Sequence, residues 1–109
     1  MSTVERIRTR AAVFAALGDV TRLGLVGQLS AAKARSISAL AAETRLTRQA
    51  VTKHLKVLQQ VGLVRPQRVG REQLYVLQPE ILAEAEGYLR AVSASWDDAL
   101  ARLQTYLEG

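Results

Sequence analysis

The chain has 109 residues, carries 15 Lys and Arg residues against 10 Asp and Glu residues, and contains no cysteine. A length of this order predicts one domain over residues 1–109. The lack of cysteine excludes disulfides, thiolate metal sites and cysteine nucleophiles. No apolar run reaches the roughly 18 residues of a membrane span, and the first residues lack the apolar core of a signal peptide. We therefore expect a cytoplasmic protein with no membrane partner.

Charge is segregated along the chain. Residues 45–73 hold seven basic residues and one acidic residue, whereas residues 80–109 hold six acidic residues and two basic ones. Charges that only keep a surface solvated would mix the two signs more evenly. The basic centre therefore predicts a polyanionic partner for that part of the chain alone.

Apolar residues in the first third of the chain recur at helical spacing. A stripe over residues 4–17 predicts a first helix, and Asp19 is suited to cap a second helix that runs to about residue 29. Gly24 and Gly27 lie inside that second helix, where each costs about 1 kcal/mol relative to alanine. The sequence therefore predicts either close packing of another backbone at these glycines or a soft helix.

Two short helices with a tight connection follow. Ser36 is a predicted N-cap for a third helix over residues 37–44, and Thr47 is a predicted N-cap for a fourth helix, which Gly62 ends. A short helix, a tight turn and a second helix with a polar outward face form the helix-turn-helix arrangement that places its second helix in the DNA major groove. We expect this arrangement over about residues 37–61.

The pattern then changes to two short strand-like runs, residues 63–65 and 74–77, on either side of Gly70. A glycine between two β-prone runs predicts a hairpin. A hairpin over about residues 63–78, directly after the two helices, is typical of the wing in winged helix-turn-helix proteins.

Pro79 can occupy the first turn of a last helix over about residues 80–108. An apolar seam runs along this helix through Leu82, Ala85, Leu89, Val92, Trp96, Leu100, Leu103 and Leu107. The seam is longer than so small a protein can easily cover, so we expect it to form a homodimer interface together with the first helix, about residues 4–17. The interface residues predicted from the two stripes are Ile7, Phe14, Leu89, Val92, Trp96, Leu100 and Leu103.

The predicted fold is therefore mainly α with a small β-hairpin, a winged helix-turn-helix with the order helix, helix, helix, helix, strand, strand, helix. The fourth helix turns Ala50, Val51, Leu55 and Leu58 inward, and its outward face carries no acidic residue. Arginine and lysine suit guanine or phosphate, glutamine suits adenine, and a helix N-terminus favours phosphate. The predicted DNA-binding residues, with the two arginines at the hairpin tip included, are Thr47, Arg48, Gln49, Thr52, Lys53, Lys56, Arg68 and Arg71.

Four stretches of this chain resemble the ArsR family of bacterial regulators: ALGDVTRL at residues 16–23, SISALA at 36–41, LTRQAVTKHLKVL at 46–58 and GLV at 62–64. The resemblance covers about residues 11–78 and extends to the flanking helices by pattern. It implies a homodimer, built from the first and last helices, that binds a dyad-symmetric operator in double-stranded DNA and represses transcription. It also implies an effector that releases the DNA.

The chain departs from the metal-sensing members of that family. Those members carry a cysteine pair at the start of the third helix, where this chain has Ser36 and Ser38, and they use histidines as well as carboxylates on the last helix, where this chain has no histidine. Zinc and soft metals need thiolate or imidazole clusters. We therefore expect no thiolate metal sensor, no bound metal and no cofactor. For His54 we expect packing or a phosphate contact.

Two rival functions lead to different expectations. An enzyme would need a nucleophile with a base, paired carboxylates or a phosphate-cradling glycine loop, and the sequence offers none of these, so we do not expect catalysis. The alternative function is a winged-helix protein-interaction module that has lost DNA binding, which would predict a neutral or acidic fourth helix. The sequence leaves open whether a small-molecule effector exists, and whether Tyr88, Trp96 and Tyr106 pack a dimer or line a ligand pocket.

Overall fold

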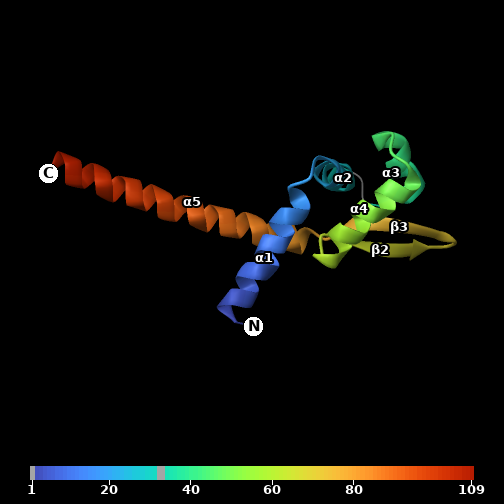
Figure 1. Ribbon diagram of the computed structural model, residues 1–109, viewed down its shortest axis with the longest axis horizontal. Helices are drawn as coiled ribbons and strands as arrows, with labels where there is room; N and C mark the ends of the chain where they lie inside the picture. The colour runs from blue at the N-terminus through green and yellow to red at the C-terminus, as the bar shows by residue number, and fades with distance from the viewer. Residues whose placement is uncertain (1, 32–33) are drawn as a thin grey trace.

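The computed structural model describes residues 2–31 and 34–109, and these residues form five helices and one three-stranded antiparallel sheet. The predicted winged helix-turn-helix fold and its order of elements are confirmed, with one additional short strand (Figure 1). The elements are α1 (Thr3–Leu17), α2 (Val20–Ala31), β1 (Arg35–Ser36), α3 (Ile37–Thr44), α4 (Arg48–Gln60), β2 (Val64–Val69), β3 (Glu72–Leu77) and α5 (Pro79–Glu108).

Side-chain caps fix where four of the helices begin, and at α2 the predicted cap Asp19 accepts at Oδ2 from the backbone N–H of Arg22 at 3.0 Å. The Ser36 hydroxyl accepts a hydrogen bond from the backbone N–H of Ala39 at 3.1 Å, and the Thr47 hydroxyl accepts one from Ala50 at 3.1 Å. All three predicted N-caps are thereby confirmed. Ser2 caps α1 through a capping box with Glu5. The Ser-x-x-Glu spacing of this box is a local sequence signal for the start of α1, which was not among the predicted caps.

Two residues with left-handed backbone delimit α4. Arg45 has φ 59° and ends α3, so the chain turns sharply before Thr47 starts α4. Gly62 has φ 81°, as predicted for the residue that ends α4. A Cβ at Gly62 would also lie 3.3 Å from the Ile81 side chain, so glycine allows both the turn and the close approach of α5.

The hairpin is longer than the two apolar runs predict. β2 and β3 pair from Val64↔Leu77 to Val69↔Glu72, which leaves a two-residue turn with Gly70 at φ 62°. Most β2 side chains are exposed, so the outer part of this strand has no apolar alternation to mark it. Pro66 fits β2 because this strand lies at the edge of the sheet.

The short strand β1 pairs with β3 through Arg35↔Tyr75 and Ser36↔Leu74, and gives the order β1-β3-β2. This strand was not predicted from the sequence, because two polar or charged residues carry no periodicity. Its pairing joins the start of α3 to the strand β3 of the wing.

The core lies where α2, α3, α4 and the sheet meet. Its fully buried side chains are Leu25, Leu40, Val51, Leu55, Leu58, Leu63 and Val64. The inward face predicted for α4 is confirmed for Val51, Leu55 and Leu58, whereas Ala50 is half-buried. No atom outside α2's own backbone comes within 4 Å of a Cβ added at Gly24 or Gly27, so the close packing considered for these glycines is absent from the described chain.

The last helix leaves the body of the protein. Its first turns pack on the core through Ile81, Leu82 and Ala85, and the side chains of residues 86–109 are exposed, with only Ala99 half-buried. This projection stretches the molecule to 68 × 32 × 21 Å (Figure 1). Among the described residues, no single helix is long and apolar enough to cross a membrane. Only α1 and α2 taken together reach that length and apolarity, as a pair bent by 90°.

Candidate DNA-binding surface

The outward face of α4 is polar and basic. Arg48, Gln49, Lys53 and Lys56 are exposed, Thr52 is half-buried, and no Asp or Glu lies in the helix. At its N-terminal end this face borders an open groove of about 770 Å³ between α4 and the start of α3. The groove is lined by Ile37, Thr47, Arg48, Gln49, Ala50, Thr52 and Lys53. The structure therefore gathers five of the eight predicted DNA-binding residues here, whereas Lys56, Arg68 and Arg71 lie outside the groove lining.

The two threonines of the groove use their hydroxyls differently. The Thr47 hydroxyl accepts from the Ala50 N–H, so its own proton stays free for an acceptor outside the protein. The Thr52 hydroxyl donates to the Arg48 carbonyl at 2.7 Å, so its proton is already committed within the helix. Thr52 therefore offers a methyl group and a lone pair to the groove, while Thr47 offers a donor.

The wing arginines lie at the far end of the hairpin. Arg68 is paired with Gln73 next to the turn, Arg71 forms the turn with Gly70, and both arginine side chains are exposed. Figure 1 shows the hairpin tip at the same end of the molecule as α3 and the start of α4, opposite the C-terminus of α5. The basic groove and the wing thus share one end of the protein.

A polar cluster behind α4 joins it to the turn between α1 and α2. Arg22 donates from Nε to the Ala16 carbonyl at 2.7 Å and from Nη2 to the Ala15 carbonyl at 3.4 Å. The Nη1 atom of Arg22 lies 3.4 Å from Nδ1 of His54. The same Nδ1 atom of His54 lies 3.8 Å from Oδ2 of Asp19. A cation bound to the last carbonyls of α1 also complements the helix dipole. His54 thereby contacts the α1–α2 turn.

Asp19 is the acidic member of this cluster. Its pKa lies below the usual value of the carboxyl, first because the backbone N–H of Arg22 donates to it and then because of the positive charges of Arg22 and His54, while partial desolvation opposes the shift. The capping role of Asp19 was predicted from the sequence, whereas the carboxylate–histidine contact and the role of Arg22 were not. Residues 22 and 54 are 32 positions apart, and local spacing contains no signal for such a contact.

The position that carries cysteines in metal-sensing ArsR proteins does not fit a thiolate site here. The Ser36 hydroxyl is engaged as the N-cap of α3, and Ser38 is exposed. Over residues 2–31 and 34–109, no three side chains of the His, Cys, Asp and Glu types gather as metal ligands would.

Comparisons with known proteins agree with this geometry. A sequence profile described as a helix-turn-helix domain matches residues 8–67. An ArsR-like transcriptional regulator from Rhodococcus sp. RHA1 is 38% identical, with 98% of this chain and 97% of that chain covered and a TM-score of 0.87. The chain belongs to the ArsR family of transcriptional regulators. As a member of that family, it is a DNA-binding transcriptional regulator with a winged helix-turn-helix fold.

Two further relatives are similar to this ArsR-family regulator. YuzN, a helix-turn-helix-type transcriptional regulator of Bacillus subtilis, is 35% identical over 77 residues, which are 65% of this chain and 84% of YuzN. A homodimeric winged helix-turn-helix DNA-binding domain from Mycobacterium bovis has a TM-score of 0.68 at 24% identity, with 92% of this chain and 91% of that domain covered. The second likeness shows the shared fold.

Proposed function

We propose that this regulator is a homodimeric repressor that binds a dyad-symmetric operator, with α4 in the major groove and the wing on the phosphate backbone. The observation that carries the proposal is the face of α4, which combines a groove at the helix N-terminus with exposed donors and no acidic side chain. An interaction module that had lost DNA binding would have no reason to exclude acids from this face. A helix N-terminus that meets phosphate is also electrostatically favourable.

The exposed residues divide into two roles. Arg48 and Gln49 stand at the start of α4 and line the groove, and they are the proposed base contacts because the N-terminal residues of a recognition helix reach base edges. Lys53 shares the groove and suits guanine or phosphate, and the Thr52 methyl suits thymine. Outside the groove, the proposed backbone contacts are Lys56, Arg68 and Arg71.

The proposal of a homodimer rests on the apolar side chains that a single chain leaves exposed on α1 and α5. Ile7 and Leu89 are 58% and 54% exposed, Trp96 is 64% exposed, and Val92, Leu100 and Leu103 are exposed on the same projecting helix. Phe14 is half-buried against Tyr88, with ring centroids 6.0 Å apart. Exposed apolar side chains in this number on α1 and α5 favour a partner, and a second copy offers a matching surface. The related domain from Mycobacterium bovis is homodimeric.

We further propose a regulatory rather than a catalytic role, and a cytoplasmic location, because a regulator of this family acts where the chromosome is.

The repressor assignment has a direct test. Genome-wide mapping of bound fragments should return a palindrome whose half-sites lie about one helical turn apart. Deletion of the gene should then raise transcription from the mapped promoter. Bound fragments without dyad symmetry, or a fall in transcription on deletion, would overturn this proposal.

The dimer has its own test. We expect Trp96→Asp to yield monomers by light scattering, because a dimer would have to bury an unpaired carboxylate in the seam. The matched control is Ala94→Asp, which places the same charge on α5 about 160° from Trp96 around the helix axis. A Trp96→Asp protein that stays dimeric would show that the interface lies elsewhere.

A further inference from the structure

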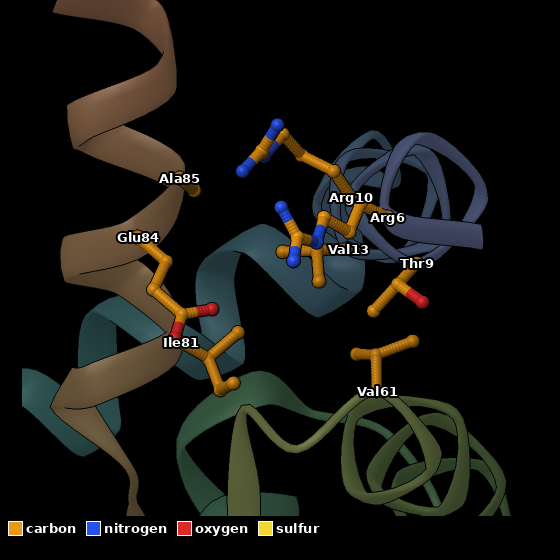
Figure 2. Close-up of a pocket in the computed structure, with 8 residues that line it drawn as sticks. All are labelled: Arg6, Thr9, Arg10, Val13, Val61, Ile81, Glu84 and Ala85. Carbon is orange, nitrogen blue, oxygen red and sulfur yellow. The ribbon is translucent and has the colours of Figure 1, made fainter. Parts of the chain in front are cut away.

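A second hollow lies behind the DNA-binding surface, at the junction of α1, α5 and the end of α4. Its volume is about 500 Å³, and Figure 2 shows the residues around it. They are Arg6, Thr9, Arg10 and Val13 from α1, Val61 from the end of α4, and Ile81, Glu84 and Ala85 from α5. A volume of this size lies within the range of about 300–1,000 Å³ that small-molecule sites occupy.

The lining has an apolar floor and a charged rim. Val13 and Ala85 are buried, and Val61 and Ile81 are half-buried, so the floor offers hydrocarbon alone. Arg6 and Arg10 extend their guanidinium groups from α1 into the space in front of α5 (Figure 2). Glu84 stands on the α5 side of the same space.

The two arginines are available to a ligand. The ion pairs present among the described residues involve Arg35, His54 and Arg90, and neither Arg6 nor Arg10 takes part in one. The guanidinium carbon of Arg10 lies 4.7 Å from the centre of the Tyr88 ring, so a cation–π contact holds this side chain at the rim. A pre-positioned guanidinium loses less conformational entropy when it binds an anion.

We propose that this cavity binds a small organic carboxylate with an apolar body, and that the bound carboxylate weakens operator binding. Two guanidinium groups against one carboxylate leave the lining one positive charge in excess, which a monoanion balances. A carboxylate accepts two parallel hydrogen bonds from one guanidinium. The apolar body covers the floor between Val13 and Ile81, and Glu84 accepts a hydrogen bond from a hydroxyl group where the ligand carries one.

The regulatory part rests on the proposed function, because it needs α1 and α5 to be the dimer helices and α4 to be the recognition helix. Val61 is the C-cap of α4, and the remaining lining residues lie on α1 and α5. A ligand in the cavity therefore contacts both the recognition helix and the helices that fix it relative to its partner copy. The two recognition helices must match half-sites one helical turn apart. A ligand that binds more tightly when α4 lies at another angle relative to α1 and α5 therefore favours the DNA-free state.

The binding part is tested on the full chain by isothermal titration calorimetry with benzoate, 4-hydroxybenzoate and octanoate as probes. Benzamide, octanol and inorganic phosphate serve as comparison ligands. We expect at least one carboxylate to bind, with its neutral analogue and phosphate at least tenfold weaker. If no carboxylate binds, or if phosphate binds equally well, the proposal is wrong.

Substitutions on α1 test whether the carboxylate binds in this cavity. Arg6→Gln combined with Arg10→Gln should weaken carboxylate binding at least tenfold, whereas Arg8→Gln, an exposed arginine of the same helix outside the lining, should leave it unchanged. Thr9→Trp fills the cavity from its exposed rim and should also abolish binding. Carboxylate binding that survives both the double variant and Thr9→Trp would overturn the assignment of the site.

The regulatory part is measured separately, by fluorescence anisotropy on the mapped operator with and without the probe. A saturating carboxylate should weaken operator binding on the order of 5- to 150-fold, the usual range of coupling between sites. Unchanged operator affinity at saturation would overturn the regulatory part. If the chain binds the carboxylate but no DNA, the ligand site stands and the proposed function is refuted. If the chain binds DNA but no carboxylate, the proposed function stands and the ligand site is refuted.

Discussion

Leu55 and Lys56 are neighbours in α4, one buried and the other exposed, and truncating each to alanine should give opposite phenotypes. The Leu55 side chain is 0% exposed, whereas that of Lys56 is exposed. A buried leucine cut to alanine loses its transfer free energy and leaves a cavity, at a cost of about 3–4 kcal/mol. At about 4–8 °C per kcal/mol for a domain near 100 residues, Leu55→Ala should lower the Tm by about 12–30 °C. For Lys56→Ala we expect a change within about 0.5 kcal/mol.

Both variants are to be unfolded thermally at one fixed protein concentration, because the Tm of a dimer depends on concentration. Operator binding is then measured against salt, well below the Tm of Leu55→Ala. Lys56→Ala should lower the slope of log K against log salt by about 0.9, the value for one lost phosphate contact. Leu55→Ala should keep the slope of the wild type. Equal losses of stability, or a changed salt slope for Leu55→Ala alone, would refute the assigned orientation of α4.

Four further substitutions test the groove, the wing and the cluster behind α4. Arg48→Ala or Gln49→Ala should cost about 1–3 kcal/mol of operator affinity and relax base discrimination on operator variants; an unchanged affinity would remove that residue from the base contacts. Arg71→Ala should weaken binding to all duplexes alike and lower the salt slope by about 1, so an effect confined to one sequence would contradict a backbone role. Asp19→Asn keeps an oxygen for the Arg22 N–H but loses the charge. Because the pKa of Asp19 is lowered in the folded state from 3.8, its charge stabilises the fold above that pH, and this stabilisation is lost as the pH falls further. The Tm advantage of the wild type over Asp19→Asn should therefore shrink in acid, and a constant advantage from neutral to acid pH would show that the charge contributes nothing.

The helix boundaries were predictable because capping is local chemistry. Ser36 and Thr47 accept hydrogen bonds from N–H groups three residues ahead, so each can be found from its immediate sequence. The groove face was predictable for a similar reason, since the buried Val51 and Leu55 orient every other residue of α4. Gly62 likewise allowed the end of α4 to be predicted, because a left-handed backbone conformation is needed there and glycine adopts it readily.

The features that the sequence did not predict depend on contacts between distant segments. β1 exists because Arg35 pairs with Tyr75, and the outer wing is held by backbone pairing without apolar alternation. The bond from Arg22 to His54 joins residues whose proximity only the packed helices create. The second cavity likewise needs α1, α5 and the end of α4 in place, so no local motif could have indicated it.

The fold places the acidic residues at the C-terminal end of α5 far from the basic groove. Asp97, Asp98 and Glu108 lie on the part of α5 that projects away from the basic groove, and the helix of 30 residues is about 45 Å long. At physiological salt, charges are screened over about 8 Å, so these carboxylates contribute little once α4 is bound. In the proposed binding mode, they repel a duplex that approaches the C-terminal end of α5 during encounter, while Arg48, Arg71 and their neighbours attract it at the opposite end. In the proposed complex, the segregation of charge therefore orients the protein on its way to DNA, and the proposed contacts of α4 select the sequence after arrival.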